Sequence, residues 1–341
     1  MAIALVFPGQ GSQAVGMGKE LYGAHASARA VFAEVDAALG ENLSELMFNG
    51  PLERLTLTEN AQPAILAVSI AAYRLLESRG VVPAFVAGHS LGEYSANVAA
   101  GTFTLADALR LVRRRGLYMQ EAVPVGEGAM AAILGLDAEK ISEACAAAAR
   151  ETGQVVSPAN LNGPGQIAIA GSREAVARAG ARAKALGAKR VIALPVSAPF
   201  HCALMKPAEN RLAPELRALI ANAHDPRVPV VANVDAEVKR DRSSAIEALV
   251  KQVSSPVQWE AVVTRLASEG VTTYVEVGPG TVLSGLVKKI HTGRRGGEAA
   301  TVLNFGSPDD LEAVERAIGP GGGIPLAWRQ SPDEASTKPS S

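Results

Sequence analysis

Residues Val86 to Glu93, with the sequence VAGHSLGE, constrain this chain most, because they place a serine between two glycines at a predicted strand-to-helix corner. The apolar run Phe85 to Ala87 predicts a buried strand, and the run Leu91 to Ala100 predicts a helix. The flanking glycines let the backbone turn sharply and let another segment approach closely. This G-x-S-x-G pattern is typical of a nucleophile elbow, in which the hydroxyl of Ser90 lies beside the first free N–H groups of the helix. A structural Gly-rich turn can produce the same pattern, so other parts of the chain must decide between the two.

The composition is that of an ordinary globular chain and excludes several classes of partner. Of the 341 residues, 48% are hydrophobic and 20% are charged, and the net charge of −1 offers no basic surface for nucleic acid or an anionic membrane. No apolar stretch is long enough to span a bilayer, and residues 1–7 predict a strand rather than a signal peptide. The two cysteines are too few for a disulfide framework. We therefore expect a cytoplasmic protein that binds neither nucleic acid nor membrane.

A Gly-flanked loop follows the first predicted strand, Ile3 to Phe7. The loop Pro8 to Ala14 matches G-x-G-x-x-A, a dinucleotide-binding pattern that requires an acidic residue about 20 positions on, at the end of a second strand. Asp36 has that spacing but lies in a helical pattern, so we do not expect a bound nucleotide. We expect instead that the loop holds the side chain of Gln10 close to the neighbouring chemistry.

Arg115 lies on the apolar face of a predicted helix, Thr104 to Val123. At 3.6 residues per turn it shares this face with apolar side chains, while Arg113 and Arg114 point elsewhere. Burying a guanidinium without a partner is costly. Arg115 is therefore either part of a structural salt bridge or a binding group for an anionic substrate, which it can hold bidentately. The pattern leaves both interpretations open.

The pattern of elements changes between residues 128 and 197. The predicted order there is that of a ferredoxin-like unit, with strands and helices at 130–134, 138–151, 155–162, 166–171, 173–186 and 190–196. Around it we expect an α/β body with a parallel sheet, formed by residues 1–127 and 198–318, so that 128–197 is an inserted subdomain. The crevice between the body and the insert is the expected substrate cleft. Residues 319–341 are rich in Gly, Pro, Ser and charge, which predicts a disordered tail.

His201 is the candidate base for the serine, because a free hydroxyl is a poor nucleophile at neutral pH. It follows the insert directly, in the sequence Ala198-Pro199-Phe200-His201-Cys202. None of the five histidines has a partner at metal-ligand spacing, so we expect no metal site. No carboxylate is evident that would orient the imidazole, and a backbone carbonyl could take that role. The N–H of Leu91, directly after the serine, is the expected oxyanion donor.

Several motifs occur in an order that resembles a known family. They are FPGQGSQ from Phe7, GHSLGE from Gly88, RG at Arg115, NLN from Asn160 with GQ at Gly165, FHCALM from Phe200, and VGPG from Val277. Together they closely resemble the malonyl-CoA:acyl carrier protein transacylases of fatty acid synthesis and the related acyltransferase domains of polyketide synthases. The resemblance covers residues 2–318 and implies an α/β-hydrolase-like body with a ferredoxin-like insert.

The resemblance implies a ping-pong acyl transfer. Ser90 would be acylated by malonyl-CoA, with His201 as general acid and base and Arg115 paired with the malonyl carboxylate. The malonyl group would then pass to the phosphopantetheine thiol of acyl carrier protein. CoA and phosphopantetheine are parts of the substrates, so no cofactor is implied, and we expect a monomer.

The remaining matched positions support these groups. Gln10 and the N–H of Leu91 match the groups that line the oxyanion hole of the family. Gln252 matches the residue whose main-chain carbonyl holds the histidine. His89 and Asn160 match further residues of the pocket.

Other functions fit parts of this pattern. A serine hydrolase or thioesterase would use the same Ser90 and His201, but it would not need an arginine on a buried face, and water would resolve its acyl-enzyme. An acyltransferase of a polyketide pathway would share all of these residues, so the motifs do not separate it from a fatty acid enzyme. A non-catalytic protein that only binds acyl carrier protein would not need the complete set. The acceptor on which turnover depends discriminates these functions.

Overall fold

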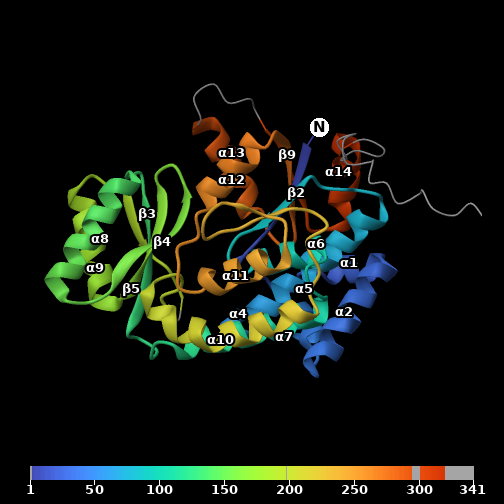
Figure 1. The fold of residues 1–341 in the computed structure, drawn as a ribbon, viewed down its shortest axis with the longest axis horizontal. Coiled ribbons are helices and arrows are strands. Elements are labelled where there is room, and N and C mark those ends of the chain that lie inside the picture. Colours follow the sequence, from blue (N-terminus) through green and yellow to red (C-terminus); the bar gives the residue numbers. More distant parts are fainter. Residues whose placement is uncertain (1, 197, 294–299, 319–341) are drawn as a thin grey trace, which may run out of the picture.

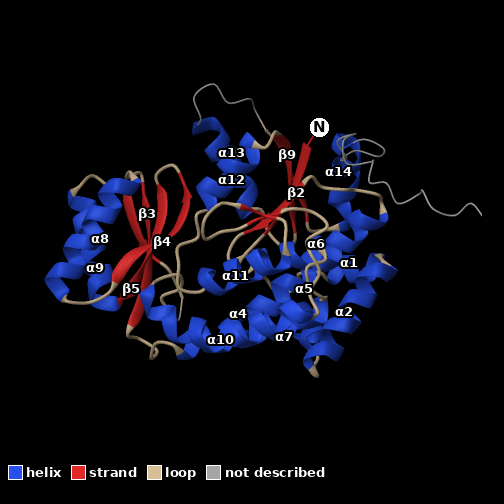
Figure 2. Cartoon of the chain, in the orientation of Figure 1, coloured by secondary structure: helices blue, strands red, loops and turns tan. Residues whose placement is uncertain are grey.

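The computed structural model describes residues 2–196, 198–293 and 300–318. Figure 1 shows the chain as two β-sheets with helices packed against them, and Figure 2 separates the sheets from the helices by colour. The predicted tail, residues 319–341, lies outside the described residues. None of the described helices combines the length and the apolar composition that crossing a membrane requires.

The six-stranded sheet has the order β10-β9-β1-β2-β7-β8 and is parallel except for the pair β7 and β8. Its strands are β1 (Ala2–Phe7), β2 (Phe85–Gly88), β7 (Val230–Val231), β8 (Val238–Lys239), β9 (Val271–Val277) and β10 (Thr301–Phe305). Strand β1 is an uninterrupted apolar run because both of its faces are covered. Ile3, Leu5 and Phe7 join one buried cluster, whereas Ala4 and Val6 join another on the opposite face. The sheet is therefore the middle layer of the body.

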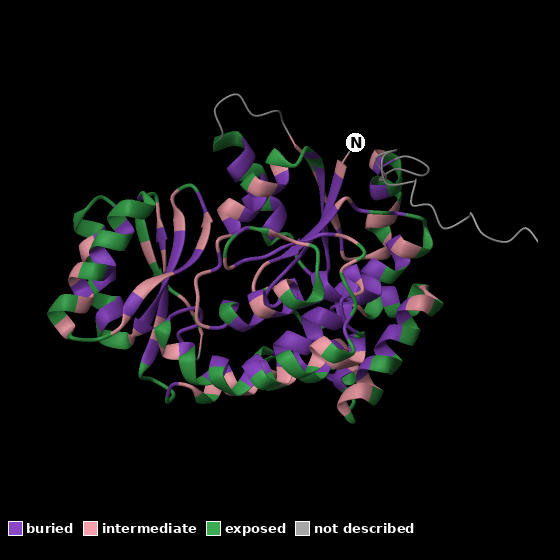
Figure 3. Ribbon diagram, in the orientation of Figure 1, coloured by how far each residue is buried: buried purple, intermediate pink, exposed green. Residues whose placement is uncertain are grey.

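Helices supply the side chains of both clusters. The cluster on the Ile3 face includes side chains from α1 (Lys19–Ala24), α2 (Ala26–Leu39), α3 (Leu43–Asn49), α4 (Leu52–Thr56), α5 (Thr58–Ser78), α6 (Gly92–Ala100), α7 (Leu105–Glu121), α10 (Lys206–Ala218), α11 (Arg242–Gln252) and α14 (Leu311–Ile318). The opposite cluster includes α12 (Trp259–Ser268) and α13 (Val282–Gly293). Helix α5 packs against both α2 and α7 and is buried along most of its length, which explains its apolar composition (Figure 3).

The four-stranded sheet is antiparallel and has the order β4-β5-β3-β6. Its elements are β3 (Gly128–Leu134), α8 (Ala138–Thr152), β4 (Val156–Gly163), β5 (Gln166–Ser172), α9 (Arg173–Ala185) and β6 (Arg190–Ala193). The two helices and one face of the sheet form a hydrophobic cluster of their own. The predicted fold class, an α/β body with a parallel sheet and a ferredoxin-like unit, is confirmed.

Strand β6 is shorter than predicted, because it ends at Ala193 instead of Val196. The N–H of Leu194 still donates to the carbonyl of Met130 at 3.0 Å, but Pro195 has no N–H with which to continue the pairing. Residues 194–196 therefore leave the sheet, and they line the cleft described below.

Strand β4 is hydrogen-bonded to the body as well as to its own sheet. The N–H of Val257 donates to the carbonyl of Ala159 at 2.9 Å, and the N–H of Leu161 donates to the carbonyl of Val257 at 2.9 Å. Helix α12 follows Val257 and packs on β4. One edge of the four-stranded sheet is thereby attached to the body, while the predicted domain boundaries at 127/128 and 197/198 stay a prediction.

Candidate active site

Ser90 lies at the turn between β2 and α6, with a φ of +52° that residues bearing a side chain rarely adopt. The turn is tightly packed. A Cβ atom at Gly92 would lie 2.0 Å from the carbonyl oxygen of Phe7, and one at Gly88 would lie 1.9 Å from the carbonyl carbon of Gly92. Only glycine fits at these two positions. The chain thus has the geometry of an elbow, with Leu91 as the N-cap of α6.

Replacing Gly92 with alanine is expected to lower the free energy of unfolding by about 3 kcal/mol or more, because the new methyl group would collide with backbone rather than with a movable side chain. The control is Gly285→Ala in α13, where no atom lies within 4 Å of the new Cβ. That change should stabilise the helix by about 0.5–1 kcal/mol. Urea denaturation measures both. Equal stabilities for the two variants would contradict the close approach of β1 and α6.

Two successive hydrogen bonds connect Ser90 to His201 and His201 to the main-chain carbonyl of Gln252. His201 Nε2 lies 2.6 Å from Ser90 Oγ, and His201 Nδ1 lies 3.0 Å from the Gln252 oxygen. Because a carbonyl only accepts, Nδ1 carries the proton and Nε2 is free to accept from the serine hydroxyl. Burial, reinforced by the positive charge of Arg115, lowers the pKa of His201 to about 3. The imidazole is therefore a neutral base.

Arg115 lies at the base of the cleft with only 1% of its surface exposed. Its Nη1 donates to Gln62 Oε1 at 2.8 Å, and its Nη2 donates to Gln252 Oε1 at 2.9 Å and to Ser90 Oγ at 3.0 Å. The guanidinium carbon also lies 5.5 Å from the centre of the Tyr94 ring. All three hydrogen-bond acceptors are neutral.

The salt-bridge interpretation of Arg115 is wrong for the part of the chain that the structure describes. No described carboxylate accepts a hydrogen bond from the guanidinium, and Nε finds no partner among the described residues. Burial accordingly lowers the pKa of Arg115. A buried cation whose charge is not balanced by a contacting anion is suited to receive one.

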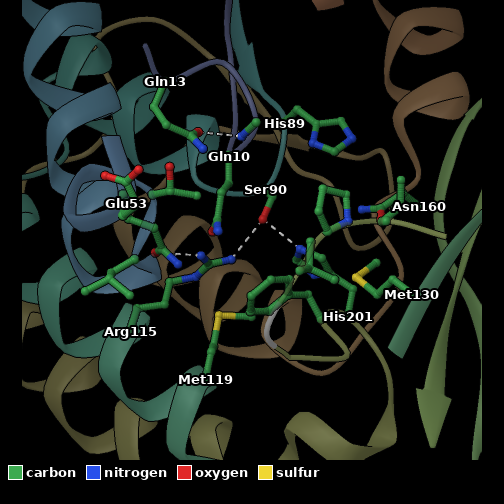
Figure 4. A pocket seen from close by; sticks show the side chains of 18 residues that line it. Gln10, Gln13, Glu53, His89, Ser90, Arg115, Met119, Met130, Asn160 and His201 are labelled. Atoms are coloured by element: carbon green, nitrogen blue, oxygen red, sulfur yellow. Dashed lines mark hydrogen bonds between the residues drawn. The ribbon is translucent and has the colours of Figure 1, made fainter. Parts of the chain in front are cut away.

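A cleft of about 530 Å³ opens onto Ser90 and is lined by both parts of the fold (Figure 4). In Figure 4 the hydroxyl of Ser90 lies between the guanidinium of Arg115 and the imidazole of His201. The wall on the side of the four-stranded sheet consists of Met130, Asn160, Leu194, Pro195 and Val196.

Each of the other predicted site residues is near this cleft. Gln10 lines it and donates from Nε2 to Thr58 Oγ1 at 3.3 Å. His89 and Asn160 also line it. Leu91 and Gln252 are fully buried behind the lining.

Two polar partners were not predicted. Gln62 holds Arg115, and Asn162 Oδ1 lies 2.8 Å from His89 Nε2. Gln62 could have been found as the polar residue in the otherwise apolar run of residues 61–68 in α5, since a buried amide needs partners. The described residues contain no group of three or more His, Cys, Asp or Glu side chains placed to hold a metal ion.

Comparisons with known proteins agree with this geometry. A family model described as an acyl transferase domain matches residues 4–317, and the chain belongs to that family. A malonyl CoA-acyl carrier protein transacylase from Escherichia coli K12 is 54% identical over 288 residues, which are 84% of this chain and 92% of that protein.

The similar solved structures include malonyltransferases. An acyl carrier protein S-malonyltransferase from Vibrio cholerae superposes with a TM-score of 0.87 at 46% identity, covering 92% of this chain and all (100%) of the other. A malonyl-transacylase solved in complex with a type II polyketide synthase acyl carrier protein superposes with a TM-score of 0.87 at 44% identity, covering 93% and 100% of the two chains.

Proposed function

We propose that this protein transfers a malonyl group from malonyl-CoA to the phosphopantetheine thiol of acyl carrier protein, through a malonyl ester of Ser90. The observation that carries the proposal is the buried charge of Arg115, which no described carboxylate contacts and whose Nη2 lies 3.0 Å from Ser90 Oγ. An acyl group that carries its own carboxylate can meet this cation while its carbonyl meets the serine. The names of the similar transacylases support the same substrates.

In the first half-reaction Ser90 Oγ attacks the carbonyl carbon of the malonyl thioester. The hydroxyl proton moves to His201 Nε2, which lies 2.6 Å away, while His201 Nδ1 keeps its hydrogen bond to Gln252. The N–H of Leu91, together with Gln10, stabilises the negative charge on the carbonyl oxygen. The C–S bond then breaks, and the imidazolium returns its proton to the sulfur of CoA.

The second half-reaction reverses these steps with a new thiol. The phosphopantetheine thiol gives its proton to His201 and attacks the ester carbonyl. Ser90 leaves with the proton from the imidazolium, and the malonyl group is now a thioester of the carrier protein. The carboxylate stays paired with Arg115 throughout, so acyl groups that lack one leave the cation unpaired and are rejected.

The proposal includes several points that rest on the sequence. The transfer uses side chains and backbone groups alone, with no metal or other cofactor. The protein acts as a monomer in the cytoplasm. Its two unpaired, buried cysteines fit this reducing compartment, in which thiols stay free. A hydrolase or thioesterase is the less favoured alternative, because water can hydrolyse its acyl-serine ester without a buried cation such as Arg115.

The acceptor dependence of deacylation tests the transferase against the hydrolase. The protein is loaded with malonyl-CoA that is radiolabelled in the malonyl group, and it is then separated from malonyl-CoA and CoA. The loaded protein is mixed with holo acyl carrier protein, with the apo form that lacks phosphopantetheine, or with buffer. We expect the label to move to the holo carrier protein far faster than it is released as free malonate, and the apo carrier protein to behave like buffer. Release of malonate at one rate in all three mixtures would establish the hydrolase instead.

The low pKa of His201 predicts how loading depends on pH. An imidazole with the ordinary pKa of about 6.5 would lose its base form, and loading would slow, as the pH falls through that value. Because the pKa of His201 is lowered to about 3, the base form persists at lower pH. We expect kcat/KM for malonyl-CoA to stay level from pH 8 to about 5. Burial also raises the pKa of the Glu93 carboxyl to about 7. A decline centred near pH 6.5 that persists in Glu93→Gln, in protein whose fluorescence shows it to be folded, would therefore contradict the prediction for His201.

A further inference from the structure

Asn233, two residues after β7, contacts the Ser90 turn and has no role in the steps above. Its side chain is fully buried and is not part of the cleft lining. Asn233 Oδ1 accepts from the N–H of Ser90 at 2.7 Å, and Asn233 Nδ2 donates to the carbonyl of Gly88 at 2.6 Å. One planar amide thus bonds two backbone groups of the turn, as a neighbouring strand would.

A second side-chain amide holds the carbonyl group of Ser90. Gln252 Nε2 donates to that oxygen at 2.9 Å and to Glu93 Oε2 at 2.8 Å. The same carboxylate oxygen accepts from the N–H of Asn233 at 3.0 Å. We call these three buried side chains, Asn233, Gln252 and Glu93, the elbow clamp.

The elbow clamp acts on a residue in an unusual conformation. With φ at +52°, Ser90 is in the left-handed region, where residues with side chains stay only when their surroundings hold them. Rotation about its backbone bonds would carry Oγ away from His201 Nε2, which is 2.6 Å distant. Both backbone polar groups of Ser90 are engaged by side chains from outside helix α6, the N–H by Asn233 and the carbonyl by Gln252.

We propose that Asn233 is a positioning residue for acyl transfer, which acts through the elbow clamp to hold Ser90 in the conformation that aims Oγ at His201. The same contact has a consequence for the oxyanion. Because Asn233 Oδ1 occupies the N–H of Ser90, that group does not donate to the substrate, and the donor from this turn is the N–H of Leu91.

The test compares Asn233→Ala with Asn304→Ala. Asn304, in β10, is a matched control because its side-chain amide also makes structural hydrogen bonds. Its Nδ2 donates to Glu276 Oε2 at 3.1 Å and to Ser284 Oγ at 2.8 Å. Two rates are measured on folded protein: single-turnover loading from malonyl-CoA, and the reaction of Ser90 with a fluorophosphonate. We expect Asn233→Ala to lower both rates about 10²-fold with little change in KM, since a small misplacement of the nucleophile has an effect of that size. Asn304→Ala should react like the wild type.

A second variant covers the case in which Asn233→Ala does not fold. Asn233→Asp has the same size and keeps the acceptor for the Ser90 N–H, but it loses the donor to the Gly88 carbonyl, so we expect about a tenfold loss in both rates. Wild-type rates in a folded Asn233 variant would overturn the proposal. A raised KM with unchanged kcat would also overturn it, because that would place Asn233 in substrate binding.

The inference rests on the proposed function, yet the two fail differently. A wild-type protein that reacts with the fluorophosphonate but is not loaded by malonyl-CoA would refute the malonyl transfer. The role of Asn233 would still be decided by the fluorophosphonate rates of its variants.

Discussion

Ser90→Ala is expected to abolish the malonyl adduct, which intact mass spectrometry detects after brief mixing with malonyl-CoA. Transfer to holo acyl carrier protein should fall by at least about 10⁴-fold, because the ester cannot form and the remaining groups only bind and orient the substrate. The fold should persist, since the change removes one hydroxyl from a turn held by its backbone.

Ser95→Ala is the matched control for this experiment. Ser95 lies in the same helix, α6, and is fully buried, but it does not line the cleft. We expect Ser95→Ala to load like the wild type. An adduct that persists in Ser90→Ala would show that another side chain is the nucleophile, and peptide mapping would identify it.

Arg115→Ala should change which acyl group is loaded. We expect kcat/KM for malonyl-CoA to fall about 10²- to 10³-fold, because the carboxylate loses a buried, charge-assisted partner worth about 2–5 kcal/mol. Loading from acetyl-CoA should fall much less, because acetyl has no carboxylate to lose this contact and is affected only through the contacts of Arg115 with Ser90 and Gln252. Competition between the two thioesters, followed by intact mass, measures the ratio directly.

Arg115→Lys separates charge from geometry at this position. Lysine keeps the positive charge but lacks the planar fork, so it should recover part of the preference for malonyl over acetyl. If malonyl and acetyl loading fell by the same factor in both variants, Arg115 would have a structural role and no part in selecting the substrate.

The local parts of this site follow from the sequence. The elbow is marked by two glycines around Ser90, and the 3.6-residue periodicity of α7 separates Arg115 from the neighbouring Arg113 and Arg114. The antiparallel unit between residues 128 and 193 follows from its order of elements. Each of these signals lies within a short stretch of chain.

The partners that complete the site lie far away along the chain. Asn233 is 143 residues from Ser90, and Gln62 is 53 residues from Arg115. No periodicity or capping pattern connects such residues, since their contacts exist only after the helices and both sheets have packed. The pairing of Val257 with β4 is of the same kind. The sequence therefore predicts the reacting groups better than the residues that hold them.

Gln252 contacts both the acid–base group and the carboxylate-binding group. Its main-chain carbonyl accepts from His201, and its side-chain oxygen accepts from Arg115. Evolution therefore has little freedom to adjust the acid–base group and the carboxylate-binding group separately, because a substitution at either one changes the setting of the other. Met119 and Leu194, by contrast, line the cleft with apolar side chains. A descendant of this protein that accepts a different dicarboxylic acyl group would most readily arise through the walls, with Arg115, His201 and Gln252 inherited together.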